Sequence, residues 1–106
     1  ASRPGSGAVG GREVEILNGN GSPRVGQEVA ERLSDGGYRI VLTGNADRFT
    51  YDETRIILHD RSPAQLAVGR DVQARLGVGV LELAATPGSV VDVTIVVGAD
   101  FPPADG

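Results

Sequence analysis

One nine-residue pattern occurs twice in this chain of 106 residues. Residues 25–33, VGQEVAERL, and residues 68–76, VGRDVQARL, share valine, glycine, an acidic residue, valine, arginine and leucine at the same positions. In both copies apolar side chains recur every four residues, which places them on one face of a helix. We therefore expect two equivalent amphipathic helices.

The residues around both copies predict where the helices begin and end. Ser-Pro precedes each copy and glycine follows it, at Ser22-Pro23, Ser62-Pro63, Gly36 and Gly77. A serine hydroxyl caps a helix start, proline is tolerated in the first turn, and glycine readily takes the left-handed conformation after the last turn. Gln65 is spaced to complete a capping box with Ser62. We expect Ser22 and Ser62 to act as caps and not as nucleophiles.

The two glycines inside the repeated pattern call for a physical reason, because glycine within a helix costs roughly 1 kcal/mol relative to alanine. Gly26 and Gly69 occupy equivalent positions. Our hypothesis is that both allow a close approach to the other helix or to the sheet.

Five short apolar runs rich in β-branched residues predict strands. They cover residues 13–17, 38–42, 54–59, 78–83 and 91–97. The resulting order, β-α-β-β-α-β-β, predicts an α+β two-layer sandwich of the ferredoxin-like split βαβ type, with two helices on one face of a mainly antiparallel sheet. We expect the last strand to be central because it is apolar on both faces.

The ends of the chain differ in composition from the rest. Residues 1–12 are rich in Gly, Ser and Pro, which predicts a flexible linker, and residues 101–106 read as a tail. Residues 13–100 form the predicted domain. No apolar run is long enough for a membrane span, so we expect any anchor to lie upstream of this chain.

Composition excludes several classes of function. A net charge of -4 argues against nucleic acid as a partner. The absence of cysteine excludes thiol catalysis and Cys-ligated metals, and His59 is the only histidine. We predict no metal and no cofactor, and a structural role for His59 at the end of a strand.

The segment Asn18-Gly19-Asn20-Gly21 follows a strand and precedes a helix, as in dinucleotide-binding folds. The third glycine of that fingerprint is replaced by Arg24, and no acidic residue ends the second strand. We interpret the segment as a tight turn. An anion site that uses Arg24 at the helix start is the alternative.

The segment after the second strand combines an amide, a carboxylate, a guanidinium and a phenol. Such groups hydrogen-bond sugars and peptide stems, and in the predicted topology this hairpin meets the first turn at one end of the sheet. The alternative is that Asn45 and Asp47 only fix the turn while Tyr51 packs on the sheet. A catalytic carboxylate pair is less favoured, because Asp47, Asp52 and Glu53 all lie in a turn. The candidate ligand-binding residues are Asn18, Asn20, Arg24, Asn45, Asp47, Arg48 and Tyr51.

Three segments carry a resemblance to a known family. They read VEILNGNGSP, VGQEVAERLSDGGYRIVLTGNADRFTY and VDVTIVVGADF. In order and spacing, residues 13–101 resemble the LytR C-terminal domain, a module found behind the catalytic domain of LytR-CpsA-Psr proteins or alone behind a membrane anchor, mainly in actinobacteria. The chain departs from the family pattern at Arg24, where glycine is frequent, and at His59, where an aromatic residue is common.

The resemblance implies an extracytoplasmic domain of the cell envelope, without the arginine-rich catalytic core of LytR-CpsA-Psr enzymes. We expect a non-catalytic accessory domain in peptidoglycan or glycopolymer assembly, a monomer or weak homodimer that binds glycan, muropeptide or a partner envelope protein. A small hydrolase or transferase acting on cell-wall polymers, and a dimerisation module that uses an open sheet edge, remain alternatives.

Overall fold

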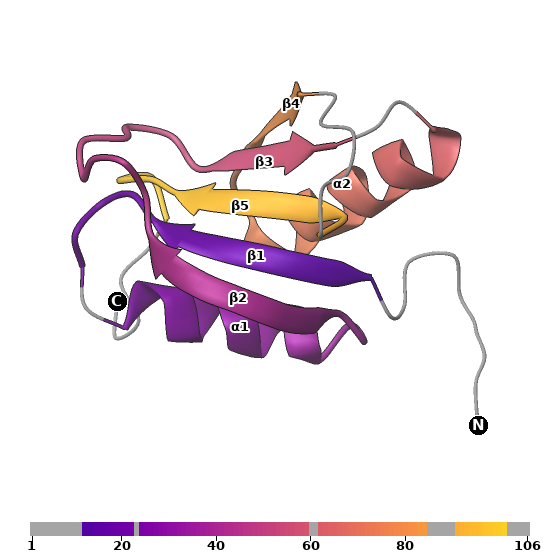
Figure 1. Cartoon of the computed structure of the whole chain (residues 1–106), viewed down its shortest axis with the longest axis horizontal. Coiled ribbons are helices and arrows are strands. Elements are labelled where there is room, and N and C mark those ends of the chain that lie inside the picture. Colours follow the sequence, from indigo (N-terminus) through magenta and orange to yellow (C-terminus); the bar gives the residue numbers. More distant parts are fainter. Residues whose placement is uncertain (1–11, 23, 60–61, 85–90, 102–106) are drawn as a thin grey trace.

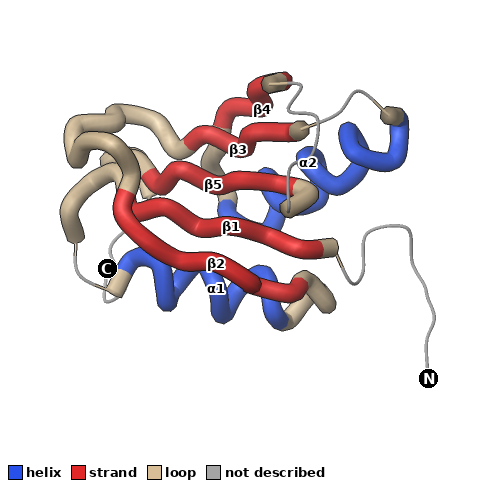
Figure 2. Tube along the Cα trace, viewed as in Figure 1, coloured by secondary structure: helices blue, strands red, loops and turns tan. Residues whose placement is uncertain are grey.

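The computed structural model describes residues 12–22, 24–59, 62–84 and 91–101 as one sheet covered by two helices (Figure 1). The elements are β1 Glu13–Asn18, α1 Val25–Ser34, β2 Arg39–Asn45, β3 Arg55–Leu58, α2 Pro63–Leu76, β4 Val80–Leu83 and β5 Val93–Val97. Both helices lie on the same face of the sheet, and the opposite face carries no helix (Figure 2). The predicted α+β class, element order and two-layer arrangement are confirmed.

The sheet is mixed, with strand order β2-β1-β5-β3-β4. Strands β2, β1 and β5 are mutually parallel, β4 is parallel to β3, and only β3 and β5 pair in an antiparallel way. The expectation of a mainly antiparallel, split arrangement is corrected here, because the two strands of each β-α-β unit are direct neighbours. The reason lies in β5, which is buried along its whole length and occupies the position between the two units. Its predicted central place is confirmed.

Helix α2 has the predicted ends. The Ser62 hydroxyl accepts a hydrogen bond from the Gln65 amide at 3.1 Å, and Gly77 closes the helix with a φ of 78°. The Gln65 side chain is buried and donates to the Asp92 carbonyl oxygen, which ties the start of α2 to the segment before β5.

Helix α1 starts later than predicted. It begins at Val25, after Arg24, which has a φ of 72° and makes no side-chain cap. Ser22 is therefore not its cap. The helix begins only at Val25 because the side chains of Asn18 and Asn20 form hydrogen bonds with the backbone of the preceding turn and hold it in a non-helical conformation.

The core lies between the sheet and the helices. Most of its side chains are aliphatic, and they come from both layers. Its largest fully buried members are Ile16, Leu33, Ile56, Leu76 and Ile95. Phe101, assigned to the tail from the sequence, is 3% exposed and belongs to this core. The Arg12 carbonyl oxygen accepts from the Arg39 amide at 2.8 Å. The packed domain thus includes residues 12 and 101, while the remainder of the predicted linker and tail lies outside the described residues.

The two repeated glycines have different surroundings. A methyl group on Gly69 would come within 2.9 Å of Leu58 and 3.1 Å of Leu81, so α2 approaches the sheet closely there. A methyl group on Gly26 would meet only Ile16, at an ordinary 3.9 Å. The close-approach hypothesis is supported for Gly69 and wrong for Gly26.

Neither helix of the described residues has the length and apolar character of a membrane span.

Candidate functional site

Three connections meet at one end of the sheet, the end at which β1, β2 and β5 terminate (Figure 1). The Tyr51 amide donates to the Gly19 carbonyl oxygen at 3.1 Å, and the Ala46 amide donates to the Asn18 carbonyl oxygen at 2.9 Å. The Ala99 amide donates to the Tyr51 carbonyl oxygen at 2.8 Å. The predicted meeting of the first turn with the segment between β2 and β3 is confirmed, and the segment after β5 joins them. The predicted pairing of these two strands as a hairpin is wrong, because β1 and β5 lie between β2 and β3 and residues 46–54 run past their ends (Figure 1). We keep the short name hairpin for residues 46–54. We call this end of the sheet the rim.

Gly19 is the point of closest contact in the rim. A methyl group at this position would lie 2.7 Å from the Val97 carbonyl oxygen and 2.8 Å from the Tyr51 ring. Such distances are shorter than real carbon contacts, and one partner is backbone. The glycine is therefore required by packing, which is a different role from cradling a phosphate.

The side chains of Asn18 and Asn20 hold the first turn. The side-chain oxygen of Asn18 accepts hydrogen bonds from the backbone amides of Asn20 and Gly21. The side-chain nitrogen of Asn18 donates to the Ser22 carbonyl oxygen. The Asn20 side chain accepts from the Ser22 amide and donates to the Gly98 carbonyl oxygen at 2.9 Å. Because these groups bond the backbone, the geometry favours the tight-turn interpretation of this segment.

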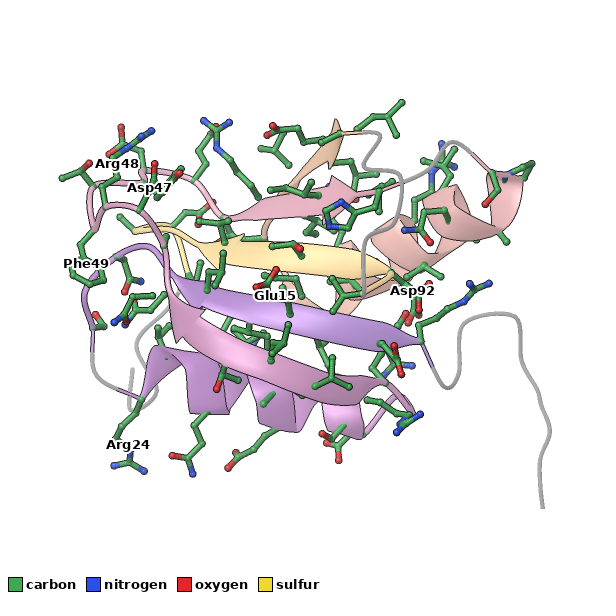
Figure 3. The ribbon with its side chains drawn as sticks, viewed as in Figure 1. Glu15, Arg24, Asp47, Arg48, Phe49 and Asp92 are labelled. Atoms are coloured by element: carbon green, nitrogen blue, oxygen red, sulfur yellow. The ribbon has the colours of Figure 1, made fainter. Side chains whose placement is uncertain are left out.

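The hairpin carries the side chains of Asp47, Arg48, Phe49 and Tyr51, which we call the hairpin cluster. Figure 3 shows Asp47 and Arg48 side by side and Phe49 apart from them at the left edge of the view. The Tyr51 hydroxyl donates to the Asp47 carboxylate at 2.7 Å, and the Arg48 guanidinium lies 3.6 Å from the same carboxylate. Arg48 also stacks over the Tyr51 ring, 4.3 Å from its centre. A carboxylate, a guanidinium and a phenol are thus held together at the surface.

The hydrogen bond inside the hairpin cluster shifts the pKa values of two of its members. The bond from Tyr51 and the nearby Arg48 lower the pKa of the Asp47 carboxyl. The hydrogen bond to Asp47 raises the pKa of the Tyr51 phenol. Asp47 is therefore held ionised, whereas the general acid of a glycoside hydrolase needs a raised pKa.

Phe49 lies at the tip of the hairpin and is 51% exposed. It was not among the predicted site residues, because the prediction for this segment considered only its polar and hydrogen-bonding side chains and Tyr51. Its ring gives the hairpin cluster an exposed apolar surface beside charged and hydrogen-bonding groups. Exposed aromatic rings beside such groups are frequent where a protein binds a ligand with mixed polarity.

A groove of about 440 Å³ runs between α1 and β2. Its lining residues are Asn18, Arg24, Gly26, Gln27, Ala30, Thr43, Gly44 and Asn45. Arg24 carries the only charge among them. Within the described residues its guanidinium pairs with no carboxylate, and it extends from the start of α1 into solvent (Figure 3).

The structure therefore divides the predicted site residues between two surfaces. Asn18, Arg24 and Asn45 line the groove, while Asp47, Arg48 and Tyr51 form the hairpin cluster. Asn20 lies between them and holds the turn. Figure 3 shows Arg24 at the start of α1, well apart from Asp47 and Arg48.

His59 takes part in a hydrogen-bonded chain across the face that carries no helix. Its Nε2 lies 2.8 Å from the Thr94 hydroxyl, which donates to the Glu15 carboxylate at 3.0 Å. Since a carboxylate only accepts, the hydroxyl proton is committed to Glu15 and His59 must donate to Thr94. A nucleophile would need the opposite arrangement, with its proton passing to histidine. The chain joins β3, β5 and β1, in keeping with the predicted structural role. Among the described residues, no three His, Asp or Glu side chains gather as a metal site would require.

Comparisons with known proteins bear on the family and on the fold. A family model described as LytR cell envelope-related transcriptional attenuator matches residues 12–101. No curated protein matches the chain. The fold is similar to the solution structure of the C-terminal domain of RV0431, with 21% sequence identity and a TM-score of 0.57 over 93% of this chain and 81% of that chain. At this identity the likeness shows the fold alone.

Proposed function

Because the chain belongs to the LytR C-terminal domain family, whose members are accessory domains of the cell envelope, we propose that it is a non-catalytic module that binds a cell-wall polymer through its hairpin cluster. The polymer is peptidoglycan or an attached glycopolymer, recognised at a glycan or muropeptide unit. An envelope-assembly protein is the alternative partner. The proposal places the domain outside the cytoplasm, tethered by a segment that is not in this chain.

The observation that carries this proposal is the composition of the hairpin cluster. Glycans and muropeptides present hydroxyls, amides and carboxylates together with apolar C–H faces. Asp47 offers an ionised acceptor, Arg48 a planar set of donors, and Phe49 an exposed ring. All three stand on the segment between β2 and β3, which the amide and carbonyl groups of Tyr51 anchor to the rim. We propose that an extended ligand contacts all three.

The proposed absence of catalysis rests on the state of the polar groups. The hydrogen bond from Tyr51 lowers the pKa of the Asp47 carboxyl, and the Thr94 hydroxyl is committed to Glu15. Neither group is prepared to donate a proton to a leaving group or to attack a carbonyl. Incubation of the protein with purified sacculi, followed by chromatography of released muropeptides, tests this directly. Any time-dependent release by the pure protein would assign the domain to a hydrolase instead.

The binding proposal is tested by NMR titration with a disaccharide muropeptide released from sacculi by muramidase. We expect amide shift changes at residues 47–51, and retention of the wild-type protein on intact sacculi in a pull-down. Arg48→Ala and Phe49→Ala should each reduce retention about fivefold to tenfold, because each removes one charged or aromatic contact.

Matched controls come from helix α2. Arg70→Ala removes an exposed arginine and Leu66→Ala an exposed apolar side chain, both outside the hairpin. Both variants should be retained like the wild type. If titration shifts avoid residues 47–51, or if the control variants lose retention equally, the assignment of the hairpin cluster is wrong.

A further inference from the structure

Strand β2 is an edge strand with one open side. It pairs with β1 and stands at the end of the strand order, so no described strand covers its other side. An edge strand presents unpaired backbone N–H and C=O groups to any chain that approaches in an extended conformation.

The second half of this edge lacks the features that usually protect it. The register with β1 shifts between Val14 and Glu15, so β2 carries an extra residue near Val41, and such a bulge discourages pairing. Beyond the bulge, residues 42–45 read Leu-Thr-Gly-Asn and contain no charge and no proline. Leu42 is 44% exposed. Pairing with an incoming strand is therefore open along these four residues.

The groove borders three of these four residues. Thr43, Gly44 and Asn45 form its β2 wall, and Gly26 and Ala30 form part of its α1 wall. Small residues leave room for side chains of a strand added to β2. A strand and a groove side by side allow main-chain pairing and side-chain selection together, as in domains that bind peptides by strand addition.

The charge of the groove indicates which kind of ligand it favours. The chain has a net charge of -4, yet the lining carries one charge, that of Arg24, which has no ion-pair partner in the part of the chain that the structure describes. Arg24 stands at the end where β2 terminates. A strand that continues the parallel order of β2, β1 and β5 would bring its carboxyl end to this position.

From these observations we infer that the groove between α1 and β2 binds the carboxyl-terminal tail of a partner protein as an added parallel strand, with the terminal carboxylate on Arg24. This site is separate from the hairpin cluster. The inference stands or falls independently of wall-polymer binding.

The experiment uses the whole chain and selects partners from a display library of random peptides with free carboxyl termini. Enriched sequences are synthesised as free acids and as carboxyl-terminal amides, and each is titrated into ¹⁵N-labelled protein. We expect amide shift changes at residues 42–45 and 24–30. The acid should bind about tenfold more tightly than the amide, because a carboxylate paired with arginine forms a strong hydrogen bond.

Protein variants separate the parts of the site. Arg24→Gln should lower the affinity of the free-acid peptide to that of the amide peptide, and it should leave the affinity of the amide peptide unchanged. Arg70→Gln is the matched control, since it removes another exposed arginine that has no ion-pair partner among the described residues, and it should change nothing. Gly26→Leu should block the groove while the helix remains folded, which a melting curve verifies.

Peptide variants test strand addition itself. Methylation of the peptide backbone nitrogens that face β2 should abolish binding. Methylation of the alternate nitrogens, which face away from β2, should leave binding unchanged. Equal binding of both methylated sets, equal affinity of acid and amide, or failure to enrich any carboxylate-dependent sequence would overturn the inference. The inference would also be overturned if a disaccharide muropeptide shifted the amide resonances of residues 42–45 and no selected peptide did. The groove would then bind the wall polymer.

Discussion

The Tyr38 hydroxyl donates a hydrogen bond of 2.6 Å to the Asp71 carboxylate. Tyr38 follows α1 and Asp71 lies in α2, so this bond joins the two β-α-β units on the helix side of the sheet. Arg75 donates to the same carboxylate oxygen at 2.8 Å. The two units are thus connected by a polar contact beside the shared aliphatic core.

Tyr38→Phe removes this hydrogen bond and keeps the buried ring. Hydrogen bonds to charged groups contribute roughly 1.5–3 kcal/mol, and the lower part of this range applies because Asp71 keeps Arg75 and is partly exposed. We expect a loss of about 1–2 kcal/mol in the free energy of unfolding, measured by urea denaturation. Tyr51→Phe is the control. Its hydroxyl bonds an exposed carboxylate, and no measurable change is expected.

The same pair makes stability depend on pH at both ends of the range. Burial raises the pKa of the Asp71 carboxyl, but the hydrogen bonds from Tyr38 and Arg75 outweigh it and lower that pKa overall. A lowered folded pKa adds stability above the unfolded value of about 4, and this is lost as the pH falls through the folded pKa. Burial, and then the bond to Asp71, raise the pKa of the Tyr38 phenol. Its contribution is present below about pH 10 and is lost as the pH rises further.

Melting temperatures from about pH 2 to 11 test this dependence. The difference between wild type and Tyr38→Phe should be largest in the neutral range and should shrink at both extremes. A constant difference across the whole range would show that the two groups do not titrate as a pair.

The two repeated glycines should respond in opposite ways to alanine. Gly26→Ala should raise the free energy of unfolding by about 0.5–1 kcal/mol, since alanine favours the helix and the added methyl meets no obstacle. In Gly69→Ala the same gain is offset by overpacking against Leu58 and Leu81, which costs about 1–3 kcal/mol. We expect no gain or a loss of up to about 2 kcal/mol. Equal stabilisation of both variants in urea denaturation would contradict this difference.

Much of the fold could be predicted from local patterns. The spacing of Val25, Val29 and Leu33 and the valine-rich run of β5 identify a helix face and a buried strand. The strand pairing could not be predicted in the same way, because it depends on which strand takes the place between the two units. The local pattern indicates that β5 is buried on both faces. Only the strand order of the folded sheet shows that β5 lies between β1 and β3.

The candidate site was predicted in part. The meeting of the first turn with the hairpin followed from parallel β1 and β2, but the groove did not. It depends on two shifts of boundary: α1 starts at Val25, and β2 continues past Leu42 to Asn45 by pairing with β1. One signal was present in the sequence, since Arg24 stands where the third glycine of the dinucleotide fingerprint would lie; in the structure it takes a left-handed conformation. Its exposure beside a groove required the structure.

The rim is held by a buried hydroxyl, and this leads to the last prediction. The Thr54 hydroxyl is inaccessible to solvent, donates to the Asp100 carboxylate at 2.8 Å and accepts from the Gly98 amide at 3.0 Å. Thr54→Val preserves the shape and leaves the buried Gly98 amide without a partner, which costs roughly 1–3 kcal/mol. Thr54→Ser retains the hydroxyl and loses only a methyl group, for a smaller loss of about 1 kcal/mol. Urea denaturation of both variants, with hydrogen exchange at Gly98, separates the two effects. Faster exchange in the valine variant alone is expected, and equal exchange in both would remove the hydroxyl from this role.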